Sequence, residues 1–121
     1  MRKKALIIEE NDNLRHLLSS FLGKEFEALA VRSGFEAMIC LHGGFIPDVI
    51  VNGKGISPTE GLQFLSNLTC SGMFGSIPVV VIGNPETEEE EQRFRQSGAV
   101  DYFRKPFNPV ALQNRMFQLI G

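Results

Sequence analysis

Short apolar runs alternate with amphipathic stretches along this chain. Residues 5–8 and 79–82 are apolar throughout, which is typical of strands that are covered on both faces of a sheet. Between such runs, apolar residues recur at helical spacing. The first stripe of this kind is formed by Leu14, Leu17, Leu18, Phe21 and Leu22. The pattern therefore predicts strands that alternate with helices.

Five strands and five helices are predicted, in strict alternation. The predicted strands cover residues 5–8, 26–31, 49–51, 79–82 and 100–104. The predicted helices follow the capping residues Asn11 or Asp12, Ser33 and Asn108, and cover residues 60–68 and 86–97. Adjacent parallel strands need crossover connections, which the intervening helices supply. The chain is therefore predicted to form an α/β fold, with a parallel sheet between two layers of helices.

The composition is that of one soluble globular domain spanning residues 1–121. Hydrophobic residues make up 43% and charged residues 21% of the chain, which excludes a disordered tail. A net charge of −2 argues against a broad nucleic-acid surface. No apolar run approaches the ~20 residues needed to cross a bilayer, and none near the start is long enough for a signal peptide. We expect a cytoplasmic protein that binds neither nucleic acid nor membrane.

The third predicted strand is the informative one for function. It is followed by Asn52 and Gly53 and then by a loop of small residues. Open α/β sheets keep their chemistry at the carboxyl ends of their strands. Neither an amide nor a glycine is a nucleophile, a strong base or a charged metal ligand. The edge where catalysis is expected therefore lacks the groups that perform it.

Four motifs resemble the receiver domain of two-component response regulators, in the order and at the spacing of that family. They are ALIIEE at residues 5–10, PDVIV at 47–51, IPVVVI at 77–82 and GAVDYFRKPF at 98–107. The resemblance covers nearly the whole chain. It implies a flavodoxin-like (βα)5 three-layer sandwich with a five-stranded parallel sheet of order 2-1-3-4-5, and a role in phosphorelay signalling.

The same resemblance assigns the positions of the family's phosphorylation site. In that family an acidic pair binds magnesium, an aspartate accepts the phosphoryl group, and a Thr or Ser and a Lys complete the site. The acidic pair falls on Glu9 and Glu10, and the Lys on Lys105. The acceptor falls on Gly53 and the Thr or Ser on Gly83, so both functional side chains are missing.

Tyr102 occupies the position of the family's switch aromatic, which swings inward when the Thr or Ser moves toward the phosphorylated aspartate. Gly83 offers no hydroxyl to follow and leaves room beside it. We therefore expect Tyr102 to rest in one orientation that does not depend on phosphate.

No other residue is expected to replace the lost acceptor. Side chains alternate across a strand, so Asn52 should point to the opposite side from residue 53, and Asp48 lies at the amino end of the strand. Magnesium is expected to bind weakly at most, because glutamates are longer than aspartates and the third carboxylate is gone. An ion pair between the acidic residues Glu9 and Glu10 and Lys105 is the expected use of these charges.

The resemblance and the missing groups together indicate a pseudo-receiver, a protein interaction module that is not an enzyme. Its expected contact surface for a protein partner or a second copy comprises the helix from Glu86 to Ser97, the strand from Val100 to Arg104 and the helix from Pro109 to Leu119. The acidic run 88–91 is expected to be a solvated helix face.

Two alternatives remain open from the sequence. One is a receiver that is still phosphorylated, at a non-standard acceptor. The other is a flavodoxin-like small-ligand binder or enzyme, for which no P-loop or G-x-G-x-x-G motif is found. Ser57 is the one candidate hydrolase nucleophile, and it lacks a G-x-S-x-G frame.

Overall fold

Five strands alternate with five helices, as predicted. The computed structural model describes residues 2–55 and 58–121, so Ser57 lies outside the described residues. The strands are β1 (Lys4–Ile8), β2 (Glu27–Val31), β3 (Val49–Gly53), β4 (Val79–Gly83) and β5 (Asp101–Arg104). The helices are α1 (Asp12–Leu22), α2 (Gly34–His42), α3 (Pro58–Thr69), α4 (Glu88–Gln96) and α5 (Pro109–Ile120).

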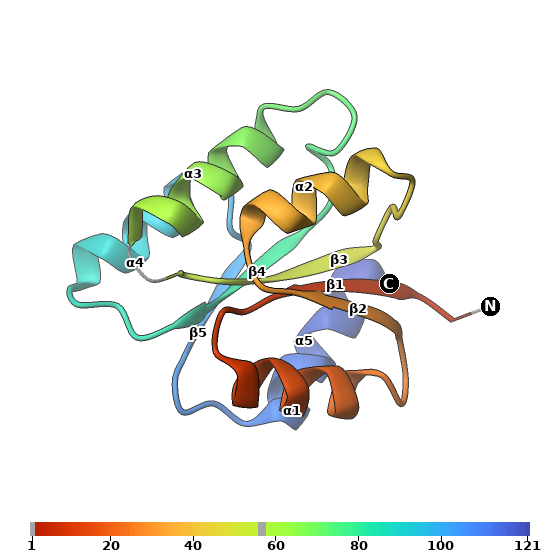
Figure 1. The fold of residues 1–121 in the computed structure, drawn as a ribbon. Helices are drawn as coiled ribbons and strands as arrows, with labels where there is room; N and C mark the ends of the chain where they lie inside the picture. The colour runs from red at the N-terminus through yellow and green to blue at the C-terminus, as the bar shows by residue number, and fades with distance from the viewer. Residues whose placement is uncertain (1, 56–57) are drawn as a thin grey trace.

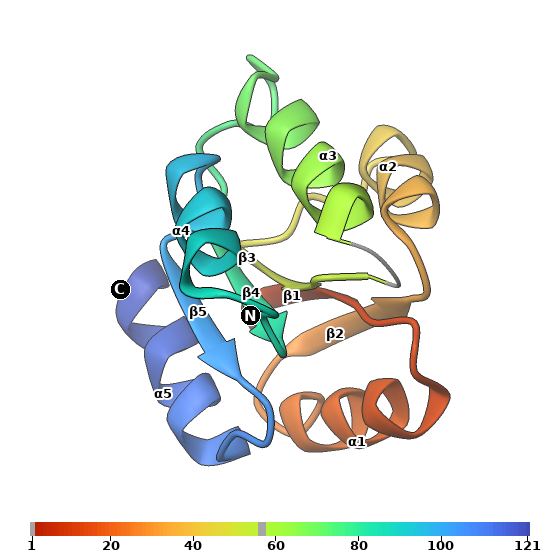
Figure 2. The same cartoon turned by 90° about the vertical axis from the view of Figure 1, so that its left-hand side faces the viewer.

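The strands form one parallel sheet in the order β2-β1-β3-β4-β5, which confirms the predicted flavodoxin-like topology. Helices α1 and α5 cover one face, and α2, α3 and α4 cover the other (Figures 1 and 2). The register pairs Ile8 with Asn52, Gly53 with Ile82, and Gly83 with Arg104. The carboxyl ends of β1, β3, β4 and β5 therefore lie next to one another.

Side-chain caps set the starts of the helices. Asn11 accepts a hydrogen bond from Leu14 N at 2.9 Å, and Ser33 accepts one from Glu36 N at 3.2 Å. These two predicted caps are confirmed. Thr87 accepts from the backbone N–H of residue 90 at 3.1 Å, so α4 begins at Glu88, two residues later than predicted.

The two faces of the sheet carry separate hydrophobic cores. The core under α1 and α5 contains Leu18, Leu22, Leu112 and Met116, but Leu17 is 51% exposed, so its predicted place in the buried stripe is wrong. On the other face, α2 buries Ala37 and Leu41. The larger apolar residues of that helix, Phe35 and Ile39, point outward and are 66% and 60% exposed.

None of the helices within residues 2–55 and 58–121 combines the length and the apolar character needed to cross a lipid bilayer.

Candidate functional site

The residues predicted to form the site do meet at the carboxyl edge of the sheet. Glu9 follows β1 and is 3% exposed, and Lys105 follows β5. Lys105 Nζ lies 3.3 Å from Glu9 Oε1, so the expected ion pair is present. The second oxygen, Glu9 Oε2, accepts a hydrogen bond from Asn11 N at 3.0 Å. Both carboxylate oxygens of Glu9 therefore have protein partners.

Gly53 ends β3 directly beside this carboxylate. A Cβ added to Gly53 would lie 2.9 Å from Glu9 Oε1 and 2.9 Å from the Ile8 backbone oxygen. These distances are shorter than carbon–oxygen van der Waals contact, so any side chain here requires movement of its neighbours. The Glu9 carboxylate thus occupies the space in which an acceptor side chain would begin.

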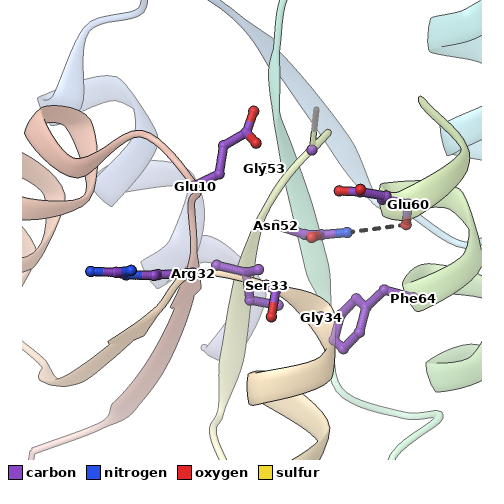
Figure 3. A pocket seen from close by; sticks show the side chains of 11 residues that line it. Glu10, Arg32, Ser33, Gly34, Asn52, Gly53, Glu60 and Phe64 are labelled. Atoms are coloured by element: carbon purple, nitrogen blue, oxygen red, sulfur yellow. Dashed lines mark hydrogen bonds between the residues drawn. The ribbon is translucent and has the colours of Figure 1, made fainter. Parts of the chain in front are cut away.

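The described residues do not fit a magnesium ion. Glu9 is engaged by Lys105 and Asn11, whereas Glu10 is exposed and lines the cleft that opens beside Gly53 (Figure 3). Magnesium requires a near-octahedral set of oxygens with little tolerance for displacement. Within residues 2–55 and 58–121, no three His, Cys, Asp or Glu side chains are arranged to hold a metal.

Lys54 fills the space beside Gly83. A Cβ on Gly83 would lie 3.1 Å from both Cβ and Cγ of Lys54. The Lys54 ammonium donates to Asn84 O at 2.7 Å and to Glu90 Oε2 at 3.0 Å. The side chains of Lys54 and Glu90 are 14% and 7% exposed, so this is a largely buried ion pair. It links the end of β3 to the β4–α4 loop and to the first turn of α4.

The Lys54–Glu90 pair corrects the prediction that the run 88–91 is a solvated face. That prediction is wrong for Glu90, because the residue accepts from Lys54 and from Glu86 N at 3.1 Å. Lys54 was not predicted as a site residue, because no motif in the sequence marks it as one. The T-x-x-E spacing of Thr87 and Glu90 could have indicated this. It is typical of a capping box, in which the glutamate reaches back toward backbone N–H groups at the start of the helix and does not point into solvent.

Tyr102 lies on the inner side of β5. Its side chain packs edge-to-face on Phe94 with ring centroids 5.7 Å apart, and the residue is 6% exposed. The hydroxyl lies 3.1 Å from the point where a Cβ of Gly83 would stand, and it has no hydrogen-bond partner among the described residues. Burial, and secondarily the negative charges of Glu90 and Glu91, raise the pKa of Tyr102 to about 12.

The buried phenol gives a direct spectroscopic test. Tyr102 is the only tyrosine, and the chain has no tryptophan, so the phenolate absorbance reports on this residue alone. We expect a titration midpoint near 12 in the folded protein and near 10 in denaturant. Because the folded state holds the proton more tightly, this contribution to stability is complete below pH 10 and is lost as pH rises through 12. A midpoint near 10 before unfolding would contradict the inward orientation.

The two side chains that could substitute for an acceptor are engaged elsewhere, although Asn52 directly precedes Gly53 in β3. Asn52 is 1% exposed, and its Nδ2 lies 3.5 Å from Gly61 O at the start of α3 (Figure 3). Asp48 accepts a hydrogen bond from Lys4 N at 2.8 Å, at the amino end of the sheet. Neither the Asp48 carboxylate nor the Asn52 amide is therefore placed where a side chain of residue 53 would accept a phosphoryl group.

Charged side chains connect α4, β5 and α5 across the surface. Glu91 of α4 pairs with Arg104 at 2.8 Å, and Asp101 of β5 pairs with Arg115 of α5 at 2.9 Å. Arg95 bridges these two pairs, at 3.5 Å from Glu91 and 3.4 Å from Asp101. Pairs this exposed contribute little stability, and they place acidic and basic groups side by side on the expected contact surface.

Comparison with known proteins gives a consistent result. A family model described as "Response regulator receiver domain" matches residues 5–117. The phosphate regulon transcriptional regulatory protein PhoB of Escherichia coli K12 is 28% identical over 117 residues, which cover 96% of this chain and 51% of PhoB. Chemotaxis protein CheY1 of Helicobacter pylori J99 is 23% identical, with 98% of this chain and 97% of CheY1 covered.

The chain therefore spans about half the length of PhoB, and nearly the whole of CheY1. Among solved structures, the chemotaxis response regulator CheY4 of Vibrio cholerae superposes with a TM-score of 0.85 at 21% identity. That comparison covers 98% of this chain and 99% of CheY4, and it shows that the two share a fold.

Proposed function

Since the chain belongs to the response regulator receiver domain family, we propose that it is an atypical receiver of two-component signalling that works without aspartyl phosphorylation. The observation that carries this proposal is the contact between Gly53 and Glu9. The acceptor position has no side chain, and the space for one is occupied by a carboxylate paired with Lys105. Within residues 2–55 and 58–121, the acceptor position then offers no nucleophile, and the Glu9 carboxylate is engaged by Lys105 and Asn11 and so is not free for a metal.

The arrangement around Gly83 supports a second part of the proposal, which is that the switch positions Gly83 and Tyr102 do not rearrange in response to phosphate. Lys54 fills the space next to Gly83 and is paired with Glu90 of α4. Tyr102 is buried against Phe94 on the same side. Lys54 and the Tyr102 hydroxyl thus occupy the space next to Gly83, and this packing is what supports a switch that does not rearrange.

The proposed role is protein–protein interaction through α4, β5 and α5. The ion pairs across these elements present neighbouring acidic and basic groups to a partner or to a second copy. Fixed charges favour a specific partner mainly through complementarity. Regulation would then depend on the availability of that partner.

Exposure to a small phosphodonor tests the proposal. We expect no covalent phosphoryl adduct when the protein is incubated with acetyl phosphate and magnesium and its intact mass is measured. The control is a receiver domain with aspartate at the acceptor position, treated in parallel. A stable adduct, located by peptide mapping, would overturn the proposal and establish phosphorylation at a non-standard acceptor.

A further inference from the structure

Two clefts and an apolar patch form one continuous surface along α2 and α3. The first cleft, of about 380 Å³, opens at the carboxyl edge of the sheet and extends to Ser33 and Phe64. The second, of about 400 Å³, shares those two residues and continues to Phe35 and Met38. Phe35 and Met38 also line the outer face of α2 together with Ile39. We refer to this surface as the α2–α3 groove.

One end of the α2–α3 groove is acidic. Glu10 and Glu60 are both exposed and both line the first cleft, on either side of Asn52 (Figure 3). Partial burial and, after it, the negative charges of Glu9 and Glu60 raise the pKa of Glu10, so Glu10 lies close to both carboxylates. The Lys105 ammonium lowers that pKa, but it is itself paired with Glu9.

Arg32 is the one basic residue among the described lining of the first cleft, and it does not neutralise this end. Its side chain extends away from Glu60 and Asn52 (Figure 3). The hydrogen bond and the charge of Arg15 lower the pKa of the Asp12 carboxyl most. Arg32 lies close enough to Asp12 for its charge to lower that pKa as well. Glu10 and Glu60 therefore face the cleft with no basic side chain between them.

The other end of the groove is apolar and exposed. Phe35 and Ile39 are 66% and 60% exposed on the outer face of α2, which carries no Lys or Arg. Large apolar side chains gathered on one exposed face mark an interaction site more often than isolated ones do. The helix is anchored to the sheet by Ala37 and Leu41 instead. The outward residues are therefore not needed to hold α2 in place.

We propose that the α2–α3 groove binds a peptide segment of a partner protein that carries a Lys or Arg beside large apolar side chains. The basic group would pair with Glu10 and Glu60, and the apolar groups would cover Phe35 and Ile39. Charge complementarity selects this occupant, because the acidic end disfavours acidic peptides and anionic lipid surfaces. The groove is distinct from the α4–β5–α5 surface, and the proposal stands whether or not the chain is phosphorylated.

Selection from a random-peptide display library provides the probe, with the purified protein as bait. We expect the enriched peptides to combine Lys or Arg with Phe, Leu or Ile. One enriched peptide, synthesised with a fluorophore, is then titrated against variants of the protein. Glu10→Gln combined with Glu60→Gln should weaken binding about tenfold, and added salt should weaken binding to the unaltered protein. Phe35→Ser combined with Ile39→Ser should abolish binding.

Matched controls keep this experiment specific. Leu17→Ser removes an apolar side chain of similar exposure from α1, and Glu25→Gln with Glu27→Gln removes two exposed charges at the start of β2. These controls should bind the peptide unchanged, and circular dichroism should show that all variants are folded. Acidic or purely apolar enriched peptides, or equal losses in the controls, would overturn the proposal.

Two further results would also overturn it. One is a dimer in sedimentation that the Phe35→Ser and Ile39→Ser changes dissociate, since a second copy would then cover the groove. The other is binding to phosphatidylglycerol vesicles that depends on the same two residues.

Discussion

Replacing Lys54 by methionine is expected to lower the free energy of unfolding by about 3 kcal/mol, because it leaves the Glu90 carboxylate buried without its ammonium partner. The pair is 3.0 Å long, and its two side chains are 14% and 7% exposed. Methionine retains most of the aliphatic volume next to Gly83, so the loss isolates the charge from the packing. Urea denaturation followed by circular dichroism measures the change.

The double variant Lys54→Met, Glu90→Gln tests whether the unpaired carboxylate causes this loss. Removing both charges should recover at least half of the lost stability, because the cost arises mainly from the unpaired carboxylate. Arg104→Met serves as the matched control. Its 2.8 Å pair with Glu91 has a 58% exposed arginine side chain, so the expected cost is below about 1 kcal/mol. Equal losses for Lys54→Met and Arg104→Met would refute the special role of Lys54.

Restoring an aspartate at position 53 is expected to destabilise the fold rather than to recover function. In Gly53→Asp the new Cβ meets Glu9 Oε1 and the Ile8 carbonyl, each at 2.9 Å. Overpacking of this kind costs about 1–3 kcal/mol, and a second carboxylate beside Glu9 adds repulsion. We therefore expect a loss of at least about 2 kcal/mol, measured in the same urea titrations.

Shortening Glu9 should relieve that cost. The double variant Gly53→Asp, Glu9→Asp moves the first carboxylate back by one methylene, so it should be more stable than Gly53→Asp alone. If the double variant is no better, then the Ile8 carbonyl and not Glu9 limits the space at Gly53. In that case the proposed occupation of the acceptor space by Glu9 is wrong.

The fold was predictable because its signals are local. Continuous apolar runs, caps such as Asn11 and Ser33, and the alternation of strand and helix specify a parallel sheet without any knowledge of tertiary contacts. The strand order and the proximity of Glu9 to Lys105 came from the family resemblance. The structure contains the predicted sheet order and this ion pair.

The site could be predicted only in part, because two of its features depend on tertiary packing. Lys54 and Glu90 are far apart in the chain, and their contact follows from how the space at Gly83 is filled. Helix α2 offers a second example. Its stripe of Phe35 and Ile39 and its stripe of Ala37 and Leu41 are both apolar at helical spacing, so periodicity cannot choose between them. The stripe that contains Ala37 faces the sheet, because a small side chain lets the helix pack close to it.

The tight contact between Glu9 and Gly53 also bears on how readily this protein could change its role. A single Gly53→Asp replacement meets a carboxylate and a carbonyl already in place, and a side chain at residue 83 would require Lys54 to shift by a few tenths of an ångström. For the atypical receiver proposed above, installing these side chains one at a time is therefore expected to lower stability unless neighbouring residues are replaced with them.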